Sequence, residues 1–237
     1  MSEKNNYKGL SGSKILITGA TDGLGFGISI ALAEEGANVI AVGRDKKKLE
    51  DLSAAAEQTK GTITLVCIDL AKQGTIEDLS RKISEKFGTL EIIIHCAMSS
   101  LQMMPINQVS LKEIETNLLS PITICFRLIT CFHGILTRSP KGLFVYISDT
   151  RREKFNGPYN SAKKACEQLL FAYREENKRL GVNVLIQYPE PMRTKLRKKV
   201  FPGESAIDSD AINKETTKII DKILMFTCLL YTSPSPE

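Results

Sequence analysis

The stretch Ile15–Ile28, with the sequence ILITGATDGLGFGI, joins an apolar run to three glycines and then to a helical pattern. Gly19, Gly23 and Gly25 follow the apolar run directly. Glycine permits a tight turn and lets the backbone approach a pyrophosphate, and the amino end of the next helix offers free N–H groups and a positive dipole end. Glycine also marks ordinary turns, but a strand before and a helix after favour a dinucleotide-binding turn.

Five further apolar runs follow and alternate with amphipathic helical patterns, such as those over residues 46–59 and 76–87. Each run is almost continuously hydrophobic, which predicts strands buried on both faces, as in a parallel sheet. The alternation predicts an α/β fold, a doubly wound, Rossmann-like parallel sheet with helices on both faces and ligands outside the carboxyl ends of the strands. The predicted strands are residues 14–18, 38–42, 63–68, 90–95, 142–148 and 182–188.

Composition and charge exclude several classes of protein. The chain has 237 residues, which suits one α/β domain, and its net charge of +5 is spread along the chain rather than gathered into a nucleic-acid-binding patch. The polar amino terminus does not resemble a signal peptide, and the longest late apolar run, residues 223–231, is too short to span a membrane. The six cysteines form no Cys-x-x-Cys pair, so we expect no disulfide framework, no metal site and a reducing, cytoplasmic location.

Several motifs after the glycine turn follow the predicted strands in a fixed order. A tyrosine and a lysine lie four residues apart in YNSAK (residues 159–163), and YPEPMRT (residues 188–194) follows the sixth predicted strand. With the Gly-x-x-x-Gly-x-Gly spacing, this set resembles the short-chain dehydrogenase/reductase family over residues 14–194. Besides the glycines, the residues that carry the resemblance are Thr18, Asp69, Asn117, Tyr159, Lys163, Pro189 and Thr194.

The resemblance implies an NAD(P)-dependent oxidoreductase of the carbonyl reductase or alcohol dehydrogenase type, which acts on a small-molecule carbonyl or alcohol as a homodimer or homotetramer. Residues four apart on a helix share a face, so Tyr159 and Lys163 can reach one site. A free tyrosine titrates at about 10, and a nearby ammonium group lowers that pKa. By resemblance, Tyr159 is the general acid, Lys163 tunes it and binds the nicotinamide ribose, and Asn117 holds a water in the proton relay.

The residues after the second predicted strand indicate which cofactor binds. An acid there favours NAD, whereas a base accommodates the 2′-phosphate of NADP. Arg44 occupies this place and Lys46–Lys48 add positive charge, while Asp45 is interpreted as a helix cap. We therefore expect NADP(H) in preference to NAD(H). The expected cofactor-binding residues are Thr18, Gly19, Gly23, Leu24, Gly25, Arg44, Asp69, Ala97, Tyr159, Lys163, Pro189 and Thr194.

The end of the fifth predicted strand departs from the family pattern. The family's serine, which donates a hydrogen bond to the substrate carbonyl, is replaced by Asp149 when the chain is aligned from the strand. An ionised carboxylate only accepts hydrogen bonds, and it repels the negative charge that develops on the substrate oxygen. Ser148 or Thr150 can substitute for the serine, Asp149 can be protonated, or the substrate can carry a cationic or donor group. Of these we select Ser148 as the fourth catalytic residue.

Other departures leave a second function open. Met98 stands where the family has a glycine near the cofactor, and Glu190 replaces the glycine after Pro189. His95 is interpreted as a residue that supports the sheet. The alternative function is an NADP(H)-binding sensor or regulator without turnover. Asp149 and Glu190 together also raise the hypothesis of a substrate that bears an amine or iminium.

The two ends of the chain differ from its central part. We expect residues 1–13 to form a polar extension and residues 14–226 to form one Rossmann-fold domain. Residues 227–237, TCLLYTSPSPE, have a linker-like composition. The family's seventh strand has no counterpart here, so we expect a sheet without its last strand. We interpret the tail as a product of truncation or read-through.

Overall fold

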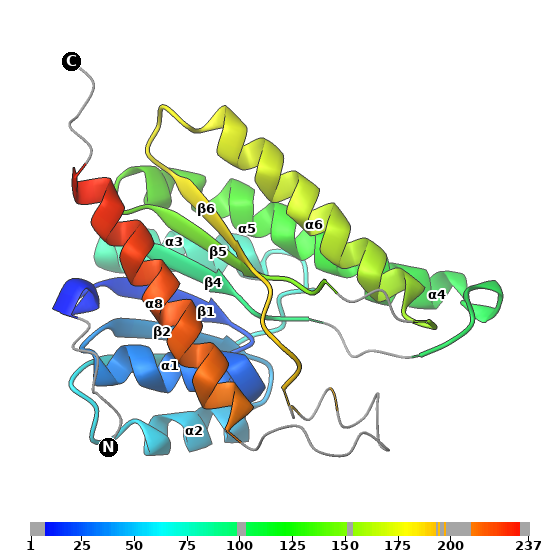
Figure 1. Ribbon diagram of the computed structural model, residues 1–237, viewed down its shortest axis with the longest axis horizontal. Helices are drawn as coiled ribbons and strands as arrows, with labels where there is room; N and C mark the ends of the chain where they lie inside the picture. The colour runs from blue at the N-terminus through cyan, green and yellow to red at the C-terminus, as the bar shows by residue number, and fades with distance from the viewer. Residues whose placement is uncertain are drawn as a thin grey trace.

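The protein forms one parallel sheet with helices on both faces (Figure 1). The computed structural model describes residues 8–98, 103–150, 154–192, 194, 197 and 210–232. Over these residues the sheet has six strands in the order β3-β2-β1-β4-β5-β6, and every neighbouring pair is parallel. The predicted doubly wound fold is confirmed, with small shifts at the strand ends. The strands are β1 (Lys14–Thr18), β2 (Asn38–Gly43), β3 (Thr62–Cys67), β4 (Ile92–His95), β5 (Leu143–Ile147) and β6 (Asn183–Gln187).

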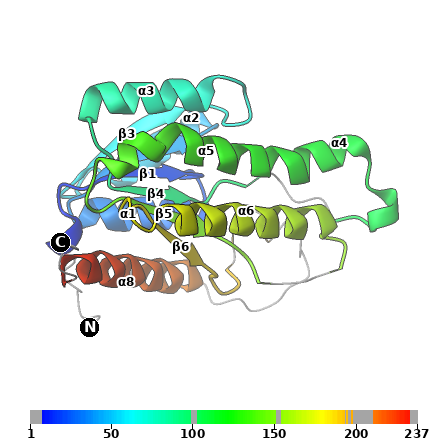
Figure 2. The same ribbon diagram turned by 90° about the horizontal axis from the view of Figure 1, so that it is seen from above.

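Two helical layers follow from the alternation of side chains along each strand. Leu16 packs in one hydrophobic core, whereas Ile15 and Ile17 pack in the other. Figure 2 shows α3, α5 and α6 on one side of the sheet and α8 on the other. The layer over Leu16 consists of α3 (Thr75–Phe87), α5 (Ser120–Thr137) and α6 (Gly157–Glu176). The opposite layer consists of α1 (Gly23–Glu34), α2 (Lys46–Ala55) and α8 (Ala211–Thr232).

The prediction that every strand is buried on both faces is wrong for β3. The central strands β4 and β5 are buried along their whole length, but both end residues of β3, Thr62 and Cys67, are exposed and its other residues are half-buried. Within the described part of the chain β3 pairs only with β2, so it is an edge strand. The apolar run predicted the strand correctly, but the burial of β3 depends on its position at the edge of the sheet.

Both predicted domain boundaries differ from the structure. Leu10, in the short 3-10 helix η1 (Lys8–Leu10), is fully buried in the core beneath α8. The folded body therefore begins before residue 14. At the other end, α8 continues to Thr232, so residues 227–232 are helical rather than linker-like. Thr227 is buried, with its hydroxyl donating to the Leu224 carbonyl. Residues 233–237 lie outside the described residues.

Among the described residues, one helical stretch, Leu111–Thr137, has the length and composition of a membrane-crossing helix, with a mean hydropathy of 1.6 over an 18-residue window. It comprises α4 (Leu111–Ile114), the π-helical turn η3 (Glu115–Leu119) and α5. Leu128 and Phe132 on this stretch are fully buried against the sheet. Packing over the sheet thus accounts for the apolar side chains on that face of the helix. The five cysteines whose side chains are described, Cys67, Cys96, Cys125, Cys131 and Cys166, are free thiols.

Candidate active site

A cleft of about 600 Å³ lies where the strands end. Residues at or just after the carboxyl ends of all six strands line it, because parallel pairing brings these ends to one edge of the sheet. Most of the predicted cofactor-binding residues line this cleft. Those residues are Gly19, Gly23, Leu24, Gly25, Arg44, Asp69, Ala97, Tyr159, Lys163, Pro189 and Thr194.

The turn that contains Gly19, Gly23 and Gly25, here called the glycine turn, lines the bottom of the cleft with backbone atoms. Gly19 and Gly23 have φ angles of 72° and 51°, a left-handed region that L side chains rarely adopt. A Cβ on Gly25 would lie 2.3 Å from the carbonyl oxygen of Gly19, so that position accepts no side chain without a shift. Helix α1 begins at Gly23 with no acidic residue in its first turn. The turn therefore fits a pyrophosphate, which needs close backbone N–H groups and a positive helix end.

The charged residues after β2 separate into those that face the cleft and those that do not. Arg44 is exposed and lines the cleft, as does Lys48, whose ammonium lies 3.3 Å from the Asp22 carboxylate. Asp45 accepts a hydrogen bond of 3.2 Å from the Lys48 backbone N–H, which confirms its interpretation as a helix cap. Lys46 pairs instead with a neighbour on α2 and stays exposed. Of the three lysines in this run, only Lys48 lines the cleft.

Tyr159 and Lys163, one turn apart on α6, both line the cleft at the end of β5. The Lys163 ammonium donates to the Ile147 carbonyl at 2.7 Å and lies 5.7 Å from the centre of the Tyr159 ring and 4.9 Å from that of Tyr146. Burial lowers the pKa of Lys163, and the negative charge of Asp149 acts in the opposite direction. The site therefore holds a buried cation beside a phenol.

Asp149, rather than Ser148, is the hydrogen-bond partner of Tyr159. The phenol donates to the Asp149 carboxylate at 3.3 Å. Ser148 is buried, and its hydroxyl donates to the carboxylate of Glu167, a buried residue in the middle of α6. Glu167 also accepts two bonds, of 2.9 and 2.7 Å, from the Lys164 ammonium. Ser148 thus contributes to the cleft wall while its proton is committed to Glu167; Thr150 is exposed.

Two residues predicted from the motifs are not among those that line the cleft. Thr18 is fully buried, and its hydroxyl lies 2.7 Å from Nδ1 of His95. Burial lowers the pKa of His95 to about 3, so the imidazole is neutral and supports the strand ends, as interpreted from the sequence. Asn117 lies in the π-helical turn η3, from which Thr116 and the following Ser120 face the cleft instead. Motif position located the helical segment but not which of its side chains line the cleft.

The segment after β6 closes the cleft over the glycine turn. Pro189, Glu190 and Thr194 line it, and a Cβ on Gly23 would lie 2.8 Å from Cγ2 of Thr194. The backbone N–H of Glu190 donates to the buried carboxylate of Glu215 at 3.2 Å. Both carboxylates noted in the sequence, Asp149 and Glu190, therefore belong to the wall of the same cleft. Met98 also lines it.

Sequence reasoning missed several residues that line the cleft. Asn156 is buried at the start of α6, and its side-chain oxygen has no hydrogen-bond partner among the described residues. Three of the missed residues lie within the quoted motifs, Asp22 in the glycine turn, Asn160 in YNSAK and Met192 in YPEPMRT, so their place in the motif was the signal that could have found them. The missed residues are Asp22, Thr116, Ser120, Asn156, Asn160, Met192 and Arg197.

We expect Gly25→Ala to destabilise the protein by about 1–3 kcal/mol, because the new methyl group meets the Gly19 carbonyl. Alanine is normally the better helix former, so the sign is opposite to that of an ordinary helical glycine. Gly134→Ala is the matched control: a Cβ on this residue of α5 meets nothing within 4 Å. We expect the control to stabilise by about 0.5–1 kcal/mol. Urea unfolding measures both, and a stabilised Gly25→Ala variant would contradict the described turn.

Comparison with known proteins agrees with the fold. A family model described as short chain dehydrogenase matches residues 13–205. The chain is 23% identical over 214 residues to dehydrogenase/reductase SDR family member 1 of Mus musculus, covering 86% of this chain and 68% of that protein. A Shigella flexneri short chain dehydrogenase complexed with NADP superposes with a TM-score of 0.81 at 23% identity, covering 92% of each chain. A Brucella melitensis 3-ketoacyl-(acyl-carrier-protein) reductase complexed with NADH gives 0.72 at 20% identity, covering 79% of each chain. The chain belongs to the short-chain dehydrogenase/reductase family of NAD(P)-dependent oxidoreductases.

Proposed function

We propose that this protein is an NADP(H)-dependent carbonyl reductase or alcohol dehydrogenase in which Tyr159 is the general acid and base. The observation that carries the proposal is the convergence of the Tyr159 phenol and the buried Lys163 ammonium on a cleft floored by the glycine turn. The nicotinamide, when bound, supplies or accepts the hydride. The protein must then move one proton to or from the substrate oxygen.

The surroundings of Tyr159 support this proton transfer. In the direction of reduction, the phenol gives its proton to the substrate oxygen and becomes a phenolate. The Lys163 ammonium stabilises that phenolate, because it is buried close to the ring and its attraction is weakly screened. The Ile147 carbonyl fixes the ammonium in place. In the direction of oxidation, the same phenolate accepts the proton of the alcohol.

We further propose that Asp149, and not Ser148, is the polar partner of Tyr159 during the reaction. The Ser148 proton is used by Glu167, which is itself held by Lys164, so freeing it would break a buried hydrogen bond. Asp149 accepts a hydrogen bond from the phenol in the resting site. Its carboxylate then stabilises the neutral phenol and opposes negative charge on the substrate oxygen. A substrate with an N–H or cationic nitrogen would instead gain from this carboxylate.

The preference for NADP(H) rests on Arg44. Its guanidinium is exposed in the cleft wall after β2, and a planar guanidinium suits a phosphate. Lys48 adds positive charge to the same wall. The solved structures compared above include one with NADP and one with NADH, so Arg44 carries the proposal rather than those neighbours.

A cofactor-binding sensor without turnover is the second candidate function. The observation that favours it is the Tyr159–Asp149 hydrogen bond, because a carboxylate beside the phenol disfavours the charge that carbonyl reduction creates. Met98 on the cleft wall is a second departure from the family pattern. Both functions require dinucleotide binding, and turnover separates them.

We expect Tyr159→Phe to lower kcat by about 10²- to 10⁴-fold while leaving the Kd for NADPH unchanged. The aromatic ring stays in place beside Lys163, and only the transferable proton is lost. The measurement is the loss of NADPH absorbance with a panel of ketones, aldehydes, enones and imines. Saturable NADPH binding by the wild type with no turnover across the panel would favour the sensor. Turnover that survives in the variant would reject Tyr159 as the acid.

We expect Asp149→Asn to move the alkaline limb of kcat/KM for carbonyl reduction to lower pH. Asp149 raises the pKa of Lys163, against the larger effect of burial, so its loss lets the ammonium lose its proton at lower pH. The phenol also loses the acceptor that favours its neutral form. Thr150→Ala, an exposed neighbour outside the cleft wall, is the control and should leave the limb in place. A limb that stays in place would show that Asp149 does not act on this pair, and a limb that moves to higher pH would contradict the expected direction.

We expect Arg44→Ala to raise the Kd for NADPH about tenfold or more and to leave the Kd for NADH nearly unchanged, because only NADPH carries the 2′-phosphate. Lys46→Ala is the matched control, since Lys46 is exposed, pairs with Glu50 and does not line the cleft. Fluorescence titration of each variant with NADPH and with NADH gives the ratio of the two Kd values. If Arg44→Ala weakened the binding of NADPH and NADH equally, Arg44 would not be the residue that selects NADPH.

A further inference from the structure

The loop after β3 forms one wall of the cleft. Asp69, Leu70 and Ala71 line the cleft at this point. Asp69 turns the loop, because its carboxylate accepts a 3.0 Å hydrogen bond from the Ala71 N–H. The hydroxyl of Thr75, at the start of α3, donates to the carbonyls of Asp69 at 2.9 Å and Lys72 at 2.8 Å. The loop is thus folded back on itself, but these contacts do not tie it to the rest of the fold.

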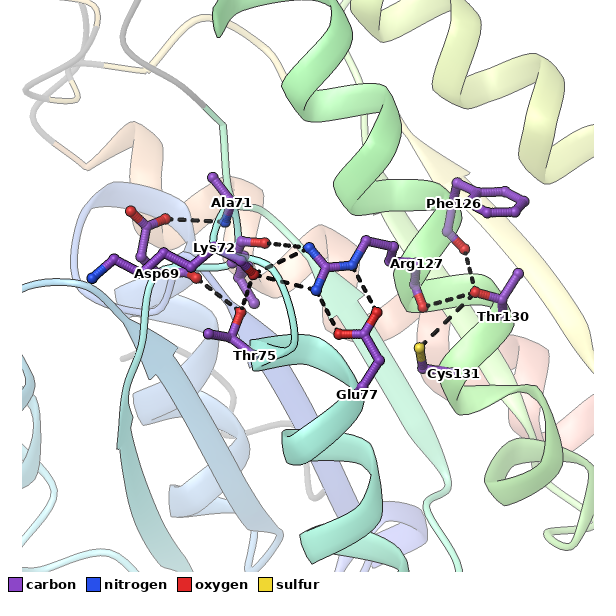
Figure 3. A network of polar contacts seen from close by, with 10 residues as sticks. Asp69, Ala71, Lys72, Thr75, Glu77, Phe126, Arg127, Thr130 and Cys131 are labelled. Atoms are coloured by element: carbon purple, nitrogen blue, oxygen red, sulfur yellow. Dashed lines mark hydrogen bonds and ion pairs between the residues drawn. The ribbon is translucent and has the colours of Figure 1, made fainter.

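Arg127 makes that connection from the neighbouring helix α5 (Figure 3). Its two terminal nitrogens donate to the loop: Nη1 to the Leu70 carbonyl at 3.4 Å and the Lys72 carbonyl at 3.2 Å, and Nη2 to the Lys72 carbonyl at 3.3 Å. Nε and Nη2 donate to the two oxygens of Glu77 at 2.9 and 2.5 Å. A guanidinium has five N–H donors, and five hydrogen bonds use them here.

The pairing with Glu77 keeps Arg127 in this orientation. Glu77 lies in the first turn of α3, where a negative charge is favourable, and its two-point contact fits the flat guanidinium. The hydrogen bonds from Arg127 lower the pKa of Glu77 to about 2, and Glu77 raises the pKa of Arg127. The pair is therefore charged throughout the neutral range. The Arg127 side chain is only 15% exposed, whereas that of Glu77 is 49% exposed, so the guanidinium is held close to the protein while its partner faces solvent.

We propose that Arg127 is a positioning residue for the adenosine end of the dinucleotide. It does not line the cleft, and it acts by holding the carbonyls of Leu70 and Lys72, so that Asp69 and Ala71 form a wall of fixed shape. The inference rests on the proposed function, since it requires a dinucleotide in this cleft. Glu77 is the second member of the device, because it orients the guanidinium.

The chemistry of the contact requires arginine in particular. A lysine in place of Arg127 would keep the charge but offer three donors on one nitrogen, so it could not bond both carbonyls and both Glu77 oxygens at once. Arg127→Lys therefore removes the geometry and keeps the charge. Glu77→Gln keeps the size and one acceptor, and tests the orientation of Arg127 without touching the loop. Arg81→Gln is the matched control: Arg81 makes two ion pairs on α3, with Asp78 at 3.2 Å and Glu85 at 3.3 Å, away from the loop.

The experiment measures binding of NADPH, of 2′,5′-ADP (the adenosine half) and of reduced nicotinamide mononucleotide (the other half). We expect Arg127→Lys to weaken NADPH and 2′,5′-ADP about tenfold and to leave the mononucleotide unchanged. Glu77→Gln should do the same to a smaller extent, and Arg81→Gln should do neither. In turnover assays the KM for NADPH should rise by the same factor at constant kcat.

Two results would overturn the inference. In the first, Arg127→Lys and Glu77→Gln weaken the binding of 2′,5′-ADP and of the mononucleotide equally, or they lower the melting temperature without changing the ratio of these two affinities. Arg127 then has a general structural role only. If both variants bind all three ligands like the wild type, the loop needs no support from α5. A wild type that binds neither NADPH nor NADH would refute the proposed function itself, and the inference with it. Circular dichroism shows which variants fold, and Glu77→Gln suffices should Arg127→Lys not fold.

Discussion

The close approach of α1 to the end of β1 is the constraint on which the rest of the site depends. The backbone of Gly25 lies against the carbonyl of Gly19, at a separation that leaves no room for a side chain. Helix α1 can therefore start directly above the strand end, with its free N–H groups toward the cleft. Parallel pairing then brings the ends of the neighbouring strands to the same level, because Thr18 is in register with Val42 on β2 and with His95 on β4. All the residues that follow these strands consequently meet around one turn.

A second constraint is the burial of a cation at the end of β5. Burying an ammonium group is unfavourable unless it is bonded and paired. The Lys163 ammonium is stabilised by the Ile147 carbonyl, by two aromatic rings and by the negative charge of Asp149. This arrangement gives Asp149 a physical role that a serine could not fill, because it balances charge as well as accepting a hydrogen bond from the phenol. It also explains how a carboxylate is accommodated at this place in the family pattern.

Polar contacts between separate elements hold both sides of the cleft. On one side, Glu167 accepts from Ser148 at the end of β5 and from Lys164 on its own helix, which ties α6 to the strand. On the other side, Arg127 and Glu77 tie α5 to α3 and to the loop after β3. Neither pair faces the substrate space. Their common effect is to fix backbone positions from which the cleft-lining residues project.

The sequence by itself determined the fold class, the strands and the helices that carry the site. Hydrophobic runs and glycine spacing are local properties, so β1 and the start of α1 could be read directly, as could the Tyr-Lys pair on α6 and the cap at Asp45. Tertiary structure alone decided which side chains meet. Ser148 and Asp149 are adjacent in the chain, yet only packing against Glu167 and Tyr159 assigns one to each partner. The burial of Leu10 and the edge position of β3 likewise depend on neighbours distant in sequence. The physical reason is that periodicity reports which residues seek burial, whereas contacts between distant segments depend on how the layers pack.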